Sequence, residues 1–255
     1  MAVKNNRIGE ENRNKIGSIM QIVEYRNSKD IDVYFPEYNW LCKHSNYNSF
    51  KNGGIKCPYE PRCCGIGYCG EGIYETNYNS KDANCYHTWY DMLLRCYSDN
   101  YHESKPTYID CYVCDEWLNY QNFAEWYYDN YYEIDNEIMN LDKDILYKGN
   151  KIYSPETCVF VPQCINSLFV KSNSIRGVLP IGVRLDKRRN KYSAQSNNGH
   201  KQQIFLGYYD TPESAFYAYK KYKENLIKQF AEDYKDCIPY NLYEAMYNYE
   251  ISIND

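Results

Sequence analysis

The chain has 255 residues, of which 25% are charged and 44% belong to the hydrophobic set, and this balance excludes an intrinsically disordered protein. No apolar run reaches the ~18 residues that a membrane-spanning helix needs, and the polar N-terminus has no apolar signal-peptide core. We therefore expect roughly one to three domains, a cytoplasmic location, no membrane partner, and reduced thiols at the 12 cysteines.

The net charge of −5 conceals a strong segregation of charge along the chain. Residues 99–145 hold twelve acids and two lysines, whereas residues 171–209 hold eight Lys and Arg residues and one acid. A basic segment is the electrostatic footprint of a nucleic-acid contact, and an acidic segment repels phosphate unless metal ions bridge the two. The distribution therefore indicates a polyanionic partner for the later segment.

The first segment, residues 8–75, contains two short β-like runs at residues 20–25 and 31–35, separated by turn signals. Short strands with frequent turns predict a small β domain. The glycines that follow are not succeeded by a helical pattern, so a dinucleotide-binding loop is not expected.

The cysteines do not form the paired knuckles of a zinc site. One C-x-x-C pair is present, Cys111 with Cys114, and no second pair matches it. Structural zinc needs four ligands, so we expect no zinc. The remaining alternative is a site built from Cys57, Cys63, Cys64 and Cys69.

The second segment, residues 85–170, follows a polar linker at residues 77–84. Apolar and aromatic residues recur at helical spacing over residues 89–96 and again over 117–127. Residues 139–146 and 158–161 are then predicted as strands, and residues 163–170 as a helix. A second linker is expected at residues 172–179.

The third segment, residues 177–251, is predicted to form three strands and one helix. The strands span residues 181–186, 191–195 and 202–208, and Thr211-Pro212-Glu213 opens the helix with an N-cap, a first-turn proline and an acid. The helix stripe that should cover one sheet face consists of Ala215, Tyr219, Tyr222 and Leu226. The opposite face is left to carry Arg184, Lys187, Arg188, Arg189, Lys191 and Lys201.

This third segment resembles the APETALA2/ethylene-response-factor type of DNA-binding domain. The matching residues are Gly182-Val183-Arg184, Lys191 to Ala194, Phe205 to Thr211, Glu213, and Ala215 to Tyr219. The resemblance implies a sheet laid in the major groove of double-stranded DNA, where Lys and Arg contact phosphates and Arg reads guanine. The implied contacts are Arg184, Arg188, Arg189, Lys191, Tyr192, Lys201 and Gln203. The alternative is an ordinary solvated basic face.

The second segment is similar to the HNH (ββα-metal) endonucleases encoded by phages. The resemblance rests on residues 87–97, 113–117, 141–144, 154–157 and 163–166. It implies that Asp142 and Asn166 hold Mg²⁺ or Mn²⁺, which stabilises the leaving phosphate oxygen. Lys143 then stands at the position of the general-base histidine, and Thr157 at that of the asparagine that orients it.

The lysine departs from the family pattern at the proton-transfer step. At pH 7 a lysine acts as a base only if its pKa falls by about 3 units, on the order of 4 kcal/mol, and the neighbouring acids Asp142 and Asp144 oppose that fall. Alternatively, Asp142 and Asp144 share one strand face and chelate the cation together with Asn166. His87 or His102 would then supply the base.

The fold expected from these segments is α+β and multi-domain: an N-terminal β module, a central ββα-metal domain, and a C-terminal three-stranded sheet with a helix. The first functional hypothesis is a metal-dependent, homing-type endonuclease. The second is a catalytically inactive DNA-binding regulator or phage counter-defence protein that uses the nuclease fold as a scaffold. The third is a protein-binding inhibitor whose acidic segment mimics DNA. The partner expected for a counter-defence protein is a host defence protein.

Overall fold

The computed structural model describes residues 7–77, 79–170, 178–200 and 202–255. It is a mixed α/β structure with several sheets and helices, which is consistent with a multi-domain α+β protein. Its internal contacts divide the chain into two compact units, residues 1–109 with 113–126, and residues 110–112 with 127–255. In the described residues, no helix is long and apolar enough to cross a membrane. The boundaries of the three sequence segments remain predictions.

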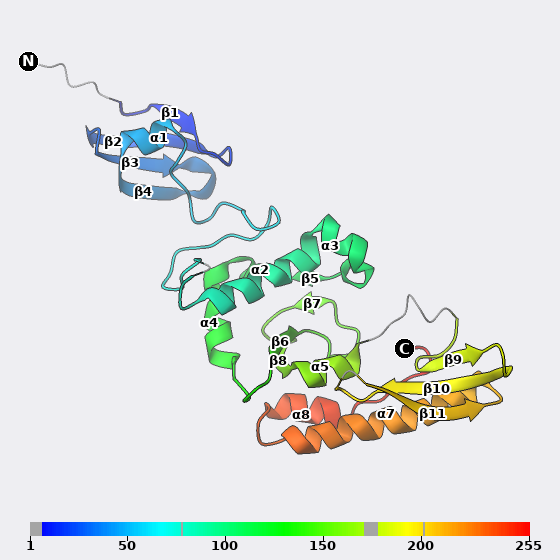
Figure 1. The fold of residues 1–255 in the computed structure, drawn as a ribbon. Coiled ribbons are helices and arrows are strands. Elements are labelled where there is room, and N and C mark those ends of the chain that lie inside the picture. Colours follow the sequence, from blue (N-terminus) through cyan, green and yellow to red (C-terminus); the bar gives the residue numbers. More distant parts are fainter. Residues whose placement is uncertain (1–6, 78, 171–177, 201) are drawn as a thin grey trace, which may run out of the picture. The chain divides into compact units, whose positions relative to one another are not determined.

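The N-terminal part of the first unit is a four-stranded antiparallel sheet whose strands follow chain order (Figure 1). Its elements are β1 (Glu11–Arg13), β2 (Ile19–Asn27), β3 (Asp30–Phe35), η1 (Pro36–Tyr38), β4 (Trp40–Ser45) and α1 (Tyr47–Lys51). Alternate apolar residues of β2 and β3, such as Ile22 and Val33, pack in one core with Phe50 of α1. The two predicted strands are confirmed; β1 and β4 were missed because polar and exposed residues dominate them.

The rest of the first unit is mainly helical. Its elements are α2 (Ala83–Tyr97), α3 (Asp99–Ser104), η2 (Pro106–Tyr108), the second residue of β5 (Tyr112–Val113), η3 (Asp115–Leu118) and the start of α4 (Tyr120–Asn130). The predicted helix over residues 89–96 is confirmed, and Trp89 Nε1 donates to the Trp117 carbonyl at 2.7 Å. The aromatic residues 117–127 do not form one helix, because Asn119 is extended and separates η3 from α4.

The second unit begins with a two-stranded sheet and a short helix. Its elements are β6 (Met139–Asp142), β7 (Ile152–Tyr153), β8 (Val159–Pro162) and α5 (Gln163–Phe169), with β6 and β8 antiparallel. Strand β6 is shorter than the predicted strand over residues 139–146, because Asp142 Oδ1 accepts the backbone N–H groups of Asp144 and Ile145 and turns the chain. The strand and helix predicted at 158–161 and 163–170 are confirmed to within a residue.

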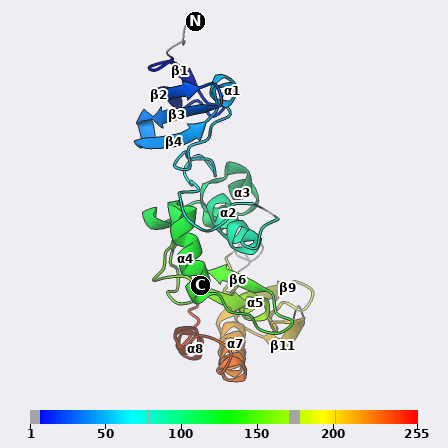
Figure 2. The ribbon, with the colours of Figure 1, turned by 90° about the vertical axis from the view of Figure 1, so that its left-hand side faces the viewer.

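The C-terminal part of the second unit contains an antiparallel sheet of order β11-β10-β9 with α7 along one face and α8 beside α7 (Figures 1 and 2). Its elements are β9 (Val183–Asp186), β10 (Lys191–Asn197), β11 (Gln203–Tyr209), α7 (Pro212–Tyr234) and α8 (Tyr240–Tyr247). The predicted helix opening is confirmed, since Thr211 Oγ1 accepts the Ser214 N–H at 3.2 Å and Pro212 follows the cap.

The buried stripe of α7 differs from the predicted one. Ala215 and Tyr219 are buried as expected, but Tyr222 and Leu226 are only half-buried. The stripe continues instead through Lys223 and Ile227. Residues four apart share a helix face. Because one residue of the buried stripe is a lysine, a count of apolar residues does not identify the stripe.

A second core joins the C-terminal module to the segment before it. Val161, Ile165 and Leu168 pack with residues of α7 and α8, among them Phe230 and Leu242. The sheet-and-helix module is therefore built into the larger unit by buried apolar contacts. The linker expected at residues 172–179 falls largely outside the described residues, which resume at residue 178.

Candidate nucleic-acid interface

Strand pairing separates the two faces of the C-terminal sheet. Val183 lies opposite Ala194, and both are buried in the core with α7. Because side chains alternate along a strand, Arg184 opposite Ser193 and Lys191 opposite Asp186 lie on the other face. We call this the outer face. The exposed Arg184 and Lys191 therefore lie where the sequence predicts DNA contacts.

Two exposed aromatic side chains complete the outer face. Tyr208 lies opposite Ser193, and Phe205 lies opposite Gln195. Tyr208 is 38% exposed and Phe205 is 53% exposed, and their ring centroids are 5.0 Å apart. The sequence alone did not indicate them, because β11 has one extra residue opposite Ala194 and Gln195, and this shift of register hides which residues of β11 share a face.

Tyr192 lies on the opposite side of the sheet from these residues. It pairs with Leu185 and Tyr209, and its ring packs half-buried against the core beneath α7. Its ring is thus less available to a ligand than Phe205 or Tyr208. Gln203 is exposed at the start of β11, whereas Lys201 lies outside the described residues.

The turn between β9 and β10 presents two further arginines. Asp186 Oδ1 accepts the backbone N–H groups of Arg188 at 3.0 Å and Arg189 at 3.2 Å. The Arg189 guanidinium lies 4.6 Å from the centroid of the Tyr208 ring. Desolvation acts to raise the pKa of Asp186, but hydrogen bonds from the Arg189 N–H and the Tyr208 hydroxyl hold that pKa below its ordinary value. A charged Asp186 thus organises the turn.

Little free energy is needed to free the Lys191 ammonium from its ion pair, so that it can bind a DNA phosphate instead. Lys191 Nζ lies 2.8 Å from Asp210 Oδ1, but both side chains are exposed. An exposed ion pair contributes only ~0–1 kcal/mol. Replacing it with a DNA phosphate releases counterions, which is the main source of sequence-independent affinity.

The Asp142 region in the second unit is a turn rather than a continuous strand. Backbone N–H groups occupy Asp142 Oδ1, and Asp144 Oδ2 lies 3.2 Å from Lys143 Nζ. Burial, together with the charge of Asp144, raises the pKa of Asp142 to about 6. Within the described residues, the second oxygen of each carboxylate takes no hydrogen bond, so both can serve as cation ligands.

Lys143 is buried, and its ammonium is held as a cation. Burial by itself would lower its pKa, but the charge of Asp144 and the hydrogen bond to it leave the pKa above its ordinary value. A lysine in this setting does not accept a proton at pH 7. Thr157, which the sequence resemblance places at the orienting asparagine, donates to the Ile152 carbonyl at 2.8 Å.

The remaining predicted catalytic residues are distributed over the fold. Asn166 is half-buried on α5, in the same unit as Asp142. His87 and His102 belong to the first unit, where His87 is exposed and a ring nitrogen of His102 lies 2.9 Å from the Arg95 carbonyl. The metal set of Asp142, Asp144 and Asn166 therefore stays a prediction.

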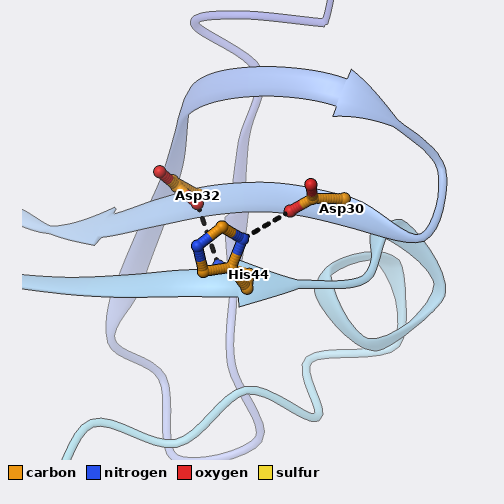
Figure 3. A group of neighbouring side chains, drawn as sticks. All are labelled: Asp30, Asp32 and His44. Carbon is orange, nitrogen blue, oxygen red and sulfur yellow. Dashed lines mark hydrogen bonds and ion pairs between the residues drawn. The ribbon is translucent and has the colours of Figure 1, made fainter.

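One other group of three potential metal ligands occurs in the described residues: Asp30 and Asp32 on β3 and His44 on β4 (Figure 3). Arg26 already occupies it, because its Nε and Nη2 each lie 2.7 Å from an oxygen of Asp30 and its Nη2 also contacts Asp32. Its guanidinium, with His44, lowers the pKa of Asp30 to about 2. The group is an arginine-centred ion-pair cluster.

Comparison with known families identifies the C-terminal module. Residues 178–229 match the AP2 domain family, so the predicted resemblance is confirmed for about a fifth of the chain. An AP2 domain indicates DNA binding. No curated protein and no solved structure matches the chain.

Proposed function

We propose that the protein binds double-stranded DNA through the outer face of β9, β10 and β11. The proposal rests on the division of the sheet into two faces. The outer face holds Arg184 and Lys191 together with two exposed aromatic residues, Phe205 and Tyr208, while α7 buries the other face. Cations supply phosphate contacts, and Arg can read guanine with two hydrogen bonds. Arg188 and Arg189 extend the same charge over the turn.

Substitution of Arg184 tests this surface. Removing a bidentate base contact costs about 1–3 kcal/mol, so Arg184→Ala should weaken binding of a preferred duplex roughly five- to hundredfold. Lys221→Ala is the matched control, because Lys221 is an exposed cation of α7. Fluorescence anisotropy with labelled duplexes measures both. If the two variants lose duplex affinity equally, the outer face does not form the DNA interface.

We further propose that this DNA-binding protein is non-catalytic, because Lys143, which the resemblance to HNH endonucleases places at the general base, is held as a cation. A rival activity, metal-dependent nicking at Asp142, Asp144 and Asn166, is favoured by one observation. The Asp142 and Asp144 carboxylates are close enough for the charge of Asp144 to raise the pKa of Asp142. Like charges in this arrangement attract a divalent cation.

Plasmid nicking in Mg²⁺ or Mn²⁺ separates these two functions. Asp142→Asn removes a metal ligand, and Asp135→Asn is the same chemical change at an exposed turn position. The non-catalytic proposal expects no nicking by any of the three proteins. Nicking that disappears only in Asp142→Asn would establish the nuclease. Mn²⁺ that raises the melting temperature at pH 7 and not at pH 5 would show binding to the ionised Asp142.

From the acidic residues 99–145 we propose a second kind of partner, a host defence protein. The structure assigns these residues partly to the first unit and partly to the second. A DNA-mimicking surface within a single unit would therefore use only part of the acidic segment. A pull-down that survives Arg184→Ala would support such a partner.

A further inference from the structure

The helix–sheet interface of the second unit contains a buried cation that the DNA-binding surface does not use. Lys223 on α7 is 2% exposed. Its Nζ donates to Asn197 Oδ1 at 2.7 Å and to the Asn197 carbonyl at 3.4 Å. An ammonium has three N–H donors, so one donor has no acceptor among the described residues.

In the part of the chain that the structure describes, no carboxylate forms an ion pair with this ammonium, and none of the residues outside that part is acidic. Asp255 lines a smaller neighbouring pocket with Lys223, but its carboxylate pairs with Lys148 at 2.5 Å. Burial alone lowers the pKa of Lys223 to about 8, with no charge acting in the opposite direction. Buried charges in proteins are normally paired. A neutral amide partner leaves the charge of Lys223 uncompensated.

Lys223 lines a cavity of about 420 Å³ between α7, the end of α5 and the sheet. This is within the size range of small-molecule sites. One part of its wall is apolar, with Leu168, Ile181 and Tyr219, and another part is polar, with Gln195 and Asn197. An apolar wall with few polar groups and one buried cation suits an organic anion.

We propose that this cavity binds a small organic anion whose carboxylate or phosphate group pairs with the ammonium of Lys223. The anion would accept the remaining N–H of Nζ in a charge-assisted hydrogen bond. Its non-polar portion would lie against the apolar wall. The occupant would neutralise the buried charge and complete its hydrogen bonding.

The cavity also has a route to the DNA-binding surface. Arg184 and Gln203, both predicted DNA contacts, line it. Occupancy would therefore change duplex affinity, and by linkage duplex binding would change anion affinity by the same factor. This coupling rests on the proposed DNA-binding function, whereas the anion site itself does not.

Calorimetry on the full chain without DNA tests the site with three probes: inorganic phosphate, adenosine 5′-monophosphate and benzoate. At least one should bind, and the strongest should identify phosphate or carboxylate as the preferred group. Lys223→Met should weaken that probe at least tenfold, while Lys221→Met, an exposed lysine half a turn away, should not. No binding of any probe at millimolar concentration, or equal binding to Lys223→Met, would overturn the proposal.

A measurement on the unsubstituted protein covers the case in which Lys223→Met does not fold. The pKa of the Lys223 amine, followed by NMR, should rise when the anion is added, because an anion stabilises the ammonium. An unchanged pKa at saturating probe would overturn the site. If the pKa of Lys223 rises with a DNA duplex but with none of the three probes, the ammonium pairs with the DNA backbone. That result would also overturn the small-anion site.

Discussion

Tyr208 connects the aromatic and the charged residues of the outer face. Its ring lies beneath the Arg189 guanidinium, and its hydroxyl hydrogen-bonds Asp186, which organises the β9–β10 turn. An exposed cation–π contact contributes about 0.5–1 kcal/mol. Tyr208 is thereby in a position to orient an arginine for DNA without contacting DNA itself.

We predict that Tyr208→Ala weakens duplex binding by about two- to fivefold, because Arg189 loses its support. Tyr208→Phe keeps the ring and should stay close to the unsubstituted protein. Anisotropy titrations of the two variants measure the difference. A loss in Tyr208→Phe as large as that in Tyr208→Ala would assign the effect to the hydroxyl and its bond to Asp186.

Lys223 should make stability depend on pH in a predictable direction. Its pKa is lowered to about 8 in the folded chain, against ~10.4 when unfolded. Below pH 8 the lysine is charged in both states, and burial of that charge costs on the order of 3 kcal/mol. As pH rises through 8 to about 10.4, the folded state releases its proton and this cost disappears.

Lys223→Met should accordingly have a larger free energy of unfolding than the unsubstituted protein at pH 7, and the gain should shrink between about pH 8 and 10. Denaturant titrations over that range measure the gain. A gain that does not vary with pH would mean that the Lys223 amine titrates normally in the folded protein.

At the level of the elements, the close approach of β9 to α7 depends on a glycine. Gly182 has a φ of +77°, and an added Cβ would lie 2.2 Å from ring atoms of Tyr219. Both the backbone conformation and the packing therefore exclude a side chain. The same glycine carries the sequence resemblance to AP2 domains, which gives that resemblance a structural reason.

Gly182→Ala should reduce the free energy of unfolding by on the order of 3 kcal/mol, combining backbone strain and overpacking. Gly149→Ala is the control, since Gly149 has a φ of +83° but no atom within 4 Å of an added Cβ. It should show only the cost of placing a side chain at positive φ, about 1–2 kcal/mol. Thermal melts of both would test the packing claim, and equal losses would contradict it.

The sequence predicted elements best where local chemistry is strong. The cap at Thr211 and the alternation of β2 and β3 were identified correctly. The buried stripe of α7 was wrong at Tyr222 and Leu226, because Lys223 occupies a core position that a count of apolar residues rejects. Phe205 was missed because its own strand, β11, has one extra residue beside it, which changes the face on which Phe205 lies. Both errors concern features that are set by tertiary packing and strand register, which a local sequence pattern does not contain.

At the scale of the molecule, the AP2 module shares its core with the residues that precede it. The family match ends at residue 229, but the second core continues through Phe230, Leu242 and Met246 to Ile165 on α5. Ile251 near the C-terminus also packs beneath the sheet with Val183. Apolar burial of this extent is a main source of stability for a small module.

We therefore predict that a fragment of residues 127–255 unfolds cooperatively, whereas a fragment of residues 178–229 shows no cooperative thermal transition. The shorter fragment loses the apolar partners of Ile227 on α5 and α8. Circular dichroism melts of both fragments measure this. A cooperative transition in the shorter fragment would show that the AP2 module folds independently of the second core.

The most direct test of the outer face as a duplex-binding surface is the salt dependence of affinity. The logarithm of the binding constant of the full chain should fall linearly with the logarithm of salt concentration between about 50 and 200 mM. Replacing Arg184, Arg188 and Lys191 together with alanine should lower the slope by about 3. A duplex affinity that does not respond to salt, or an unchanged slope in the triple variant, would contradict the account.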